Sequence, residues 1–524
     1  MSIEKSKMPV SRQIRYLRRS RDNWKENAAK KQEKIREYEQ TIRVLSNSRE
    51  NWKTQAKEAK KRIKELEKKI EELERQDLKE KDSQLLEVLG ENPLKISGHH
   101  YTAQTIQISV QQIIEAGNSY RGVATTMKIL FQSSSIKSPH YSSIRQWVER
   151  IGLFELMRDK KRDDWIYIVD LTLQLGQEKA LIIYGVSESL WTNQILERGG
   201  TLRHTDGEIL GIEVTESATG EWIQEMLEKV TLQVGIPLQI VADSGSNLKK
   251  GIKLYQENYP QVIYTYDVTH AMANLLKKEL LADEVFQSFL SDCHQCRQQL
   301  QQTELAFAAP PSQRAQCRYF NLERLVNWAT SLLNCPLDTL YQLMPLTDFQ
   351  AINERLKEKF LWLDKYQNQL PSWRMMLKIT RSLEKQLKTL GLNKESLNKF
   401  HKELSFLGIS ENLEPFKQSV FSYLESQVKM IQDDRTILAT SDVLESIFGQ
   451  YKRFSKRCPL QELRSILLTI PILTMNLTKT LIKQALETIR GLDLSEWVNE
   501  IFGQSMLSKR QAVFSSADGD MKTA

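Results

Sequence analysis

A heptad repeat near the N-terminus is the feature that most restricts how this chain can fold. From Ile14 to Leu73, alternating steps of three and four residues meet an apolar or aromatic side chain at fifteen of eighteen positions. The three exceptions are Arg21, Lys31 and Arg49. A 3.5-residue period held this long predicts a coiled coil, because a straight lone helix would drift off the seam. We therefore predict one long helix over 11–80 that acts as a dimerisation rod. A helical hairpin folded back on its own domain is the alternative.

The same segment carries the excess of positive charge. The whole chain has a net charge of +8, but residues 1–82 hold 25 Lys and Arg against 16 Asp and Glu, which is +9. The remaining residues hold 49 against 50, which is −1. Such asymmetry indicates a polyanionic partner, and nucleic acid is the usual one. A solvated charged helix with a lysine excess is the plainer interpretation.

Composition excludes several classes of protein. Every apolar run is broken by charge within ~18 residues, so we expect no membrane span and no membrane partner. The N-terminus is basic but lacks the apolar region of a secretory signal. Five cysteines in 524 residues do not make a disulfide framework. We expect a cytoplasmic protein in a reducing compartment.

Residues 97–158 predict a compact unit of three helices behind a short linker. The expected helices are 102–116, 120–131 and 141–155. Three compact helices after a basic rod are typical of a helix-turn-helix DNA-binding domain, although any small three-helix bundle gives the same pattern. The side chains expected to contact DNA are Arg145 and Arg150, with Lys137 and His140 at phosphates.

From residue 163 the hydrophobic period changes from helical to strand-like. Strands are predicted at 165–175, 180–186, 209–215, 238–242 and 262–266, with helices at 219–234 and 246–259 in the last two intervals. The order β-β-β-α-β-α-β predicts an α/β fold with a mixed sheet over 163–270. The pattern is helical over 271–440 and again over 441–505. The tail, 506–524, is expected to be disordered.

Three acidic residues occupy special places in this order. Asp170 interrupts the apolar first strand, IYIVDLTLQL, and Asp243 directly follows the fourth, QIVAD. Because these strands can lie side by side in a mixed sheet, both carboxylates are expected near one edge. Glu445, in TSDVLESIFGQYK, falls on the first turns of a later helix. Singly, such an Asp is often a strand-edge or turn residue, but the three together predict a catalytic cluster.

Clustered carboxylates predict a site for divalent cations. Two carboxylates ~4 Å apart repel by about 4 kcal/mol at an effective dielectric near 20, and a third adds to the conflict. Mg2+, with Mn2+ as a possible substitute, prefers such oxygen ligands and keeps water and phosphate in its other positions. Two such ions ~3.5–4 Å apart can activate a water or a 3′-hydroxyl and stabilise the leaving oxygen of a phosphodiester. Glu213 and Glu216, near the end of the third strand, are rival third ligands.

The cysteines are a second candidate for a metal site. Cys293 and Cys296, with Cys317 and Cys335 further along the chain, have residue types that bind zinc. The first pair lies within a continuous helical pattern, which favours packing over a zinc site.

The strings around the acidic residues resemble a known family. VADSGSNLKKGI, SDVLESIFGQYK and the β-β-β-α-β-α-β order resemble the DDE transposases of prokaryotic insertion sequences. YDVTHAMANLLKKEL carries an Asp-x-x-His signature, at Asp267 and His270, similar to that of the hAT-like transposases. The resemblance covers roughly residues 100–480. It implies an RNase H-like core interrupted by an all-helical insertion domain at 271–440.

The resemblance also implies a function. Such a protein binds the terminal repeats of its element as double-stranded DNA, cleaves the ends, and joins the 3′-hydroxyls to target DNA near the prokaryotic nucleoid. We expect a catalytic role for His270, at a carboxylate or the scissile phosphate, with Asp267 beside it; Asp267 as a simple helix N-cap is the alternative. Two other functions stay open: an RNase H-like nuclease without strand transfer, and a catalytically inactive, domesticated transposase that only binds DNA.

Overall fold

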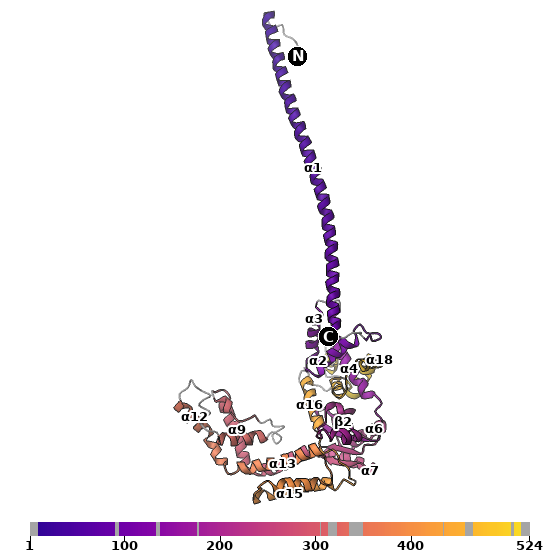
Figure 1. Ribbon diagram of the computed structural model, residues 1–524, viewed down its shortest axis with the longest axis vertical. Coiled ribbons are helices and arrows are strands. Elements are labelled where there is room, and N and C mark those ends of the chain that lie inside the picture. The colour runs from indigo at the N-terminus through magenta and orange to yellow at the C-terminus, as the bar shows by residue number, and fades with distance from the viewer. Residues whose placement is uncertain are drawn as a thin grey trace, which may run out of the picture. The chain divides into compact units, whose positions relative to one another are not determined.

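The computed structural model describes residues 9–89, 94–132, 137–175, 178–303, 305–312, 322–334, 349–432, 434–455, 465–504 and 508–514 (Figure 1). The chain divides into two compact units, Met1–Val88 with Phe131–Lys137, and Leu89–Leu130 with Ser138–Ala524. The interval between the first two predicted strands includes residues 176 and 177, which lie outside the described ranges. In the predicted tail, residues 508–514 are helical, which corrects that part of the expectation, and 515–524 are outside the described residues.

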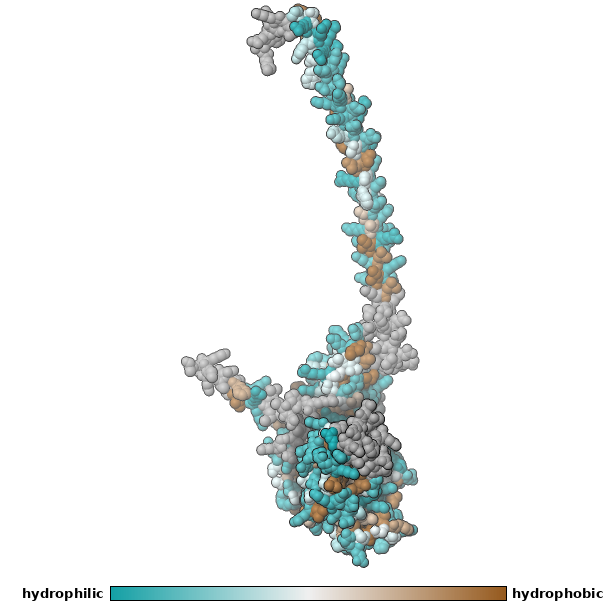
Figure 2. Space-filling model, turned by 90° about the vertical axis from the view of Figure 1, so that its left-hand side faces the viewer, coloured by the Kyte–Doolittle hydropathy of each residue, from teal (hydrophilic) through white to brown (hydrophobic). Residues whose placement is uncertain are grey.

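The first unit is dominated by α1, Val10–Leu89, a continuous helix of 80 residues. At 1.5 Å per residue it is about 120 Å long. Its heptad residues are open to solvent, with Trp24 73%, Trp52 69% and Leu45 63% exposed. Figure 2 shows hydrophobic patches recurring along a mostly hydrophilic rod. The predicted long helix is therefore confirmed, and the fold-back hairpin is wrong because the helix has no break.

The second unit begins with three helices, α2 (Ala103–Ile114), α3 (Tyr120–Leu130) and α4 (Tyr141–Met157), close to their predicted bounds. They pack with three C-terminal helices, α17 (Thr469–Leu473), α18 (Lys479–Thr488) and α19 (Gly491–Phe502). The contact is closest at Gly152 of α4, where an added Cβ would lie 1.9 Å from the carbonyl oxygen of Leu468. Only glycine fits at this crossing.

A five-stranded mixed sheet forms the centre of the second unit. Its strands are β1 (Trp165–Leu175), β2 (Glu178–Ser187), β3 (Gly207–Thr215), β4 (Gln239–Ala242) and β5 (Ile263–Tyr266). Their spatial order is β3-β2-β1-β4-β5. β1 pairs with β2 and β2 with β3 in antiparallel fashion, whereas β1, β4 and β5 run parallel. The predicted adjacency of strand one and strand four is confirmed, and β5 pairs with the other side of β4.

Alternation along the strands divides the core into two layers. Trp165, Tyr167 and Val169 of β1 face α6 (Gly220–Val234) and α7 (Ser246–Asn258). Ile166 and Ile168 face the opposite way, with Leu444, Ile447 and Phe448 of α16 (Asp442–Ser455). The period of two therefore turns position 170 toward α16. In β4, Val241 lies in the same layer as Ile168, so position 243 also belongs to the α16 side.

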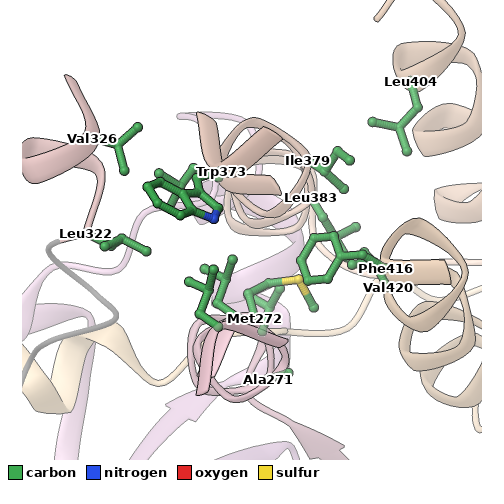
Figure 3. Packing of buried hydrophobic residues seen from close by; sticks show 14 of the residues in the cluster. Ala271, Met272, Leu322, Val326, Trp373, Ile379, Leu383, Leu404, Phe416 and Val420 are labelled. Atoms are coloured by element: carbon green, nitrogen blue, oxygen red, sulfur yellow. The ribbon is translucent and has the colours of Figure 1, made fainter. Parts of the chain in front are cut away.

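Between β5 and α16 the regular structure of the described residues is helical, as predicted, apart from one isolated β-bridge between Leu392 and Ile437. Its helices are α8 (Val268–Ala282), α9 (Glu284–Leu300), α10 (Leu322–Leu333), α12 (Phe349–Phe360), α13 (Leu370–Leu390), α14 (Ser396–Ser405) and α15 (Glu414–Val428). They share one apolar core in which Met272, Trp373, Leu383, Phe416 and Val420 converge from α8, α13 and α15 (Figure 3). Cys293 and Cys296 of α9 are both buried, in keeping with the packing interpretation.

Candidate active site

Asp170 and Asp243 lie side by side at one edge of the parallel pair. Val169 of β1 is opposite Ala242 of β4, so the two aspartates occupy the next register position on both strands. The regular pairing of β1 with β2 is interrupted between Asp170 and Leu173. Bulges of this kind bend a strand and redirect side chains next to functional sites. The sheet therefore brings together the two acids that the sequence separates by about seventy residues.

Asp170 is a buried acid in an electronegative environment. The residue is only 4% exposed to solvent. Burial, together with the charges of Asp243 and Glu445, raises the pKa of its carboxyl to about 7 against the lowering effect of His270. The charged form of this carboxyl is therefore disfavoured by its surroundings.

Asp243 also has a local structural role. Its Oδ1 accepts a hydrogen bond from the backbone N–H of Gly245 at 3.0 Å, which forms an Asx-type turn into α7. Tyr264 of β5 donates its hydroxyl to the Asp243 carbonyl at 2.8 Å. Asp243 is half-buried, so it can serve both as a turn residue and as a member of the candidate active site.

Glu445 is bound by the predicted histidine. It lies in the first turn of α16, and its Oε1 is 3.1 Å from Nε2 of His270 in the first turn of α8. Burial lowers the pKa of His270, but its bond to Glu445 and the charges of Asp267, Glu445 and Asp243 outweigh this and raise it to about 9. The imidazole is therefore protonated at neutral pH, and it places one positive charge among these acids.

Asp267 joins the two helices that carry this pair. As N-cap of α8 it accepts from the backbone N–H of His270 at 2.7 Å, so the alternative role given for Asp267, that of a helix cap, is confirmed. Its other oxygen accepts from the backbone N–H of Ser441 at 2.5 Å and from the Ser441 hydroxyl at 3.0 Å. The side chain is fully buried, and burial raises the pKa of its carboxyl despite the nearby charge of His270. One carboxylate thus fixes the starts of α8 and α16 together.

Two further contacts at the start of α16 were not predicted. Thr269 donates to Oδ1 of Asp442 at 3.0 Å, and Nζ of Lys388, from α13, lies 2.6 Å from Oδ2 of the same residue. The sequence indicates for Asp442 only a place near the start of the predicted helix that carries Glu445. No local signal identifies its partners, because they lie 173 and 54 positions away.

The donor set suits Mg2+ in its chemistry. Asp170, Asp243 and Glu445 supply only oxygen atoms. Burial raises the pKa of Asp170 most, and the charges of Asp243 and Glu445 add to it; a cation would offset these charges. Among the described residues, however, no three His, Cys, Asp or Glu side chains converge closely enough to hold one ion together. Glu445 is instead bonded to His270. The two aspartates are the part of the predicted metal site that the fold brings into adjacent positions.

The rival third ligands are less well placed. Glu213 lies on β3, two strands away from β1, and its carboxylate is 2.7 Å from Nζ of Lys229 on α6. Glu216 follows the end of that strand. Strands are spaced about 4.8 Å apart, so β3 is roughly 10 Å from the strand that carries Asp170. Glu445, on the helix that covers the correct face of the sheet, is the better candidate.

The predicted DNA contacts differ in availability. Arg145 is exposed and paired with Glu149 at 3.2 Å. His140 is exposed and caps α4. Lys137 is exposed, in the unit that contains α1.

Arg150 is occupied within the protein. Its guanidinium donates to the carbonyl oxygens of Ile489 at 2.6 Å and Leu486 at 2.5 Å, at the end of α18. These bonds satisfy terminal helix carbonyls, so they give Arg150 a structural explanation that the sequence did not. The geometry does not favour the predicted contact between Arg150 and DNA.

No helix in the described part of the chain combines the length and apolar character needed to cross a membrane. No protein-family model and no curated protein matches this chain. Among solved structures it is similar to the Drosophila P element transposase strand transfer complex, with 11% identity and a TM-score of 0.37, over 78% of this chain and 98% of that one. At these values the likeness assigns the chain to no family and no activity.

Proposed function

We propose that this protein is a DNA transposase with an RNase H-like core, in which Asp170, Asp243 and Glu445 form a DDE site. The observation that carries the proposal is the adjacent placement of Asp170 and Asp243 on parallel strands β1 and β4. The sheet order β3-β2-β1-β4-β5, with only β2 reversed relative to its parallel neighbours, supports the RNase H-like assignment. The position of Glu445 on α16, which packs on the same face, supports the third assignment.

In this proposal Asp170 and Asp243 hold Mg2+, and Glu445 completes the ligand set. Bound Mg2+ would supply activation of a water or a 3′-hydroxyl and stabilisation of the leaving oxygen. The protonated His270 neutralises Glu445 and orients its carboxylate. With Glu445 as a metal ligand, the Nε2–H of His270 would be available to donate a hydrogen bond to a phosphate oxygen. Asp267 keeps α8 and α16 in register, because it bonds to both.

The proposed partners are double-stranded DNA, as element ends and target, and a second copy of the chain. The apolar heptad seam of α1 is exposed along its length, and pairing would bury it. The basic excess of residues 1–82 would add phosphate contacts at the ends or the target.

The test is cleavage of duplex DNA that carries the sequences flanking this gene. We expect the purified protein to nick these ends in Mg2+, to expose 3′-hydroxyls and to join them to a second duplex, with no reaction in excess chelator. Cleavage without joined products would instead indicate an RNase H-like nuclease. Binding without cleavage would indicate an inactive DNA-binding protein.

A further inference from the structure

A row of positive charge runs along α13. Its cations follow one another at steps of four, three, four and three residues: Arg374, Lys378, Arg381, Lys385 and Lys388. This spacing places all five on one face of the helix. The face next to it is buried and packs Trp373, Leu377 and Leu387 into the core of the helical region. The row is therefore held in place by a helix that cannot turn.

Three of the five cations have no counter-charge among the residues that the structure describes. Arg374, Lys378 and Lys385 are exposed, and in the part of the chain that the structure describes none of them forms an ion pair or hydrogen bond through its side chain. Arg381, by contrast, pairs with Glu323 and Glu384. Like charges three and four residues apart destabilise a helix. Their unneutralised accumulation on one face points to a ligand with several negative charges.

The row leads to the candidate active site. At its C-terminal end, Lys388 contacts Asp442, three residues before Glu445 on α16. At its other end, Arg374 and Lys378 border a cavity of about 680 Å³ that Asn334 and Gln367 also line. Cations and amides together can bond to phosphate oxygens. From Arg374 to Lys388 the helix rises about 21 Å, a length that matches about six base pairs of duplex at 3.4 Å each.

We propose that this face of α13 binds the phosphate backbone of duplex DNA and aligns it toward Asp170 and Asp243. The inference rests on the proposed function, since it assigns the path of that function's own substrate. Backbone contacts fix the position of DNA without reading its sequence. The helical region between β5 and α16 then acts as a guide for DNA as well as a spacer before Glu445.

The test compares two triple variants of the full-length protein. Arg374→Gln/Lys378→Gln/Lys385→Gln removes the three unpaired cations of the row. Lys399→Gln/Lys402→Gln/Lys429→Gln removes three exposed cations from α14 and the end of α15, with the same change in charge. Fluorescence anisotropy of a labelled 30-base-pair duplex gives the affinity at several salt concentrations, and circular dichroism checks that both variants are folded.

We expect the row variant to lose about 0.9 in the slope of log affinity against log salt for each phosphate contact removed, or about eightfold in affinity per contact at 0.1 M salt. The control variant should stay near the wild type. Equal slopes and affinities for the row variant and the wild type would overturn the proposed role of the row in DNA binding, while leaving the proposed function in place. An equal loss in both variants would also overturn it, since total charge alone would then explain binding. A wild-type protein that binds no duplex would overturn both proposals.

Discussion

The two units of this protein treat their aromatic residues in opposite ways. In α1, Trp24 and Trp52 are 73% and 69% exposed, whereas Trp165 and Trp191 in the sheet unit are 2% and 0% exposed. Both units have a regular apolar pattern, with a period of 3.5 in one and 2 in the other. The sheet unit covers its apolar face with its own helices. The seam of α1 remains open.

The difference separates two kinds of task. A unit with a closed core can hold charged groups at fixed distances, which a reaction requires. A lone helix with an open seam gains most of its stability from a partner, because isolated helices are marginal in water. We therefore expect changes in the sheet unit to affect chemistry and changes in α1 to affect assembly. The predictions below test this division.

The largest effect is expected at the carboxylates. Changing Asp170, Asp243 or Glu445 to Ala should lower the cleavage rate by several powers of ten. Each power of ten corresponds to roughly 1.4 kcal/mol of activation free energy. End binding and self-association should persist. Rates of single-turnover cleavage in Mg2+ measure this. Glu213→Ala and Glu216→Ala are the controls, and a Glu445→Ala protein that cleaves at the wild-type rate would transfer the third role to one of them.

Deletion of residues 1–82 should affect assembly and DNA affinity rather than chemistry. It removes the heptad seam and nine net positive charges, so we expect loss of self-association and a smaller salt dependence of DNA affinity. Sedimentation velocity measures the first effect. A finer test compares two variants of the full-length protein. Ile42→Asp/Leu45→Asp places charge on the seam, whereas the control Val44→Asp changes an exposed apolar residue off the seam. An unchanged oligomer after deletion would place the self-association surface in the sheet unit.

A smaller loss of activity is expected at His270. Without its bond to Glu445 the carboxylate is less well oriented, so His270→Ala should slow cleavage by one or more powers of ten. DNA binding and melting temperature should change little. His401→Ala, an exposed histidine on α14, provides the control. A His270→Ala protein that cuts normally but melts several degrees lower would make the histidine a packing residue.

A change of stability with pH, without a change of chemistry, is expected at Asp170. The pKa of Asp170 is raised from 3.8 to about 7, mainly by burial, so the folded state favours its protonated form. Its contribution to stability is present below pH 4 and is lost as the pH rises through 7, at about 1.4 kcal/mol per pKa unit at most. Asp170→Asn should therefore melt higher than the wild type at pH 8 without metal, and equally at pH 4. Added Mg2+ should narrow the difference by stabilising the wild type alone. A constant difference from pH 4 to 8 would refute this.

The sequence predicts the local features of this fold well. The strand bounds, the long helix and the Asp267 cap each depend on residues within a few positions of one another. The capping bond, for example, spans only three residues. The adjacency of β1 and β4 could also be predicted from the sequence, because apolar strands in a mixed order have few ways to pair.

Contacts between distant segments could not be predicted in this way. Arg150 looks like a DNA contact from its neighbours in sequence, but its partners at Leu486 and Ile489 lie more than 330 positions away. The second half of the Asp267 interaction, with Ser441, spans 174 positions. The cation row of α13 is visible in the sequence as a spacing. Only the contact between Lys388 and Asp442 relates it to the candidate active site.

The separation of the acids along the chain has a consequence for synthesis. Asp170 and Asp243 leave the ribosome together with the sheet strands, whereas Glu445 follows about 200 residues later, after the whole helical region. At roughly 5–20 residues per second, the third acid emerges about 10–40 s after the second. A nascent chain can therefore complete its sheet while it still lacks the third proposed catalytic group.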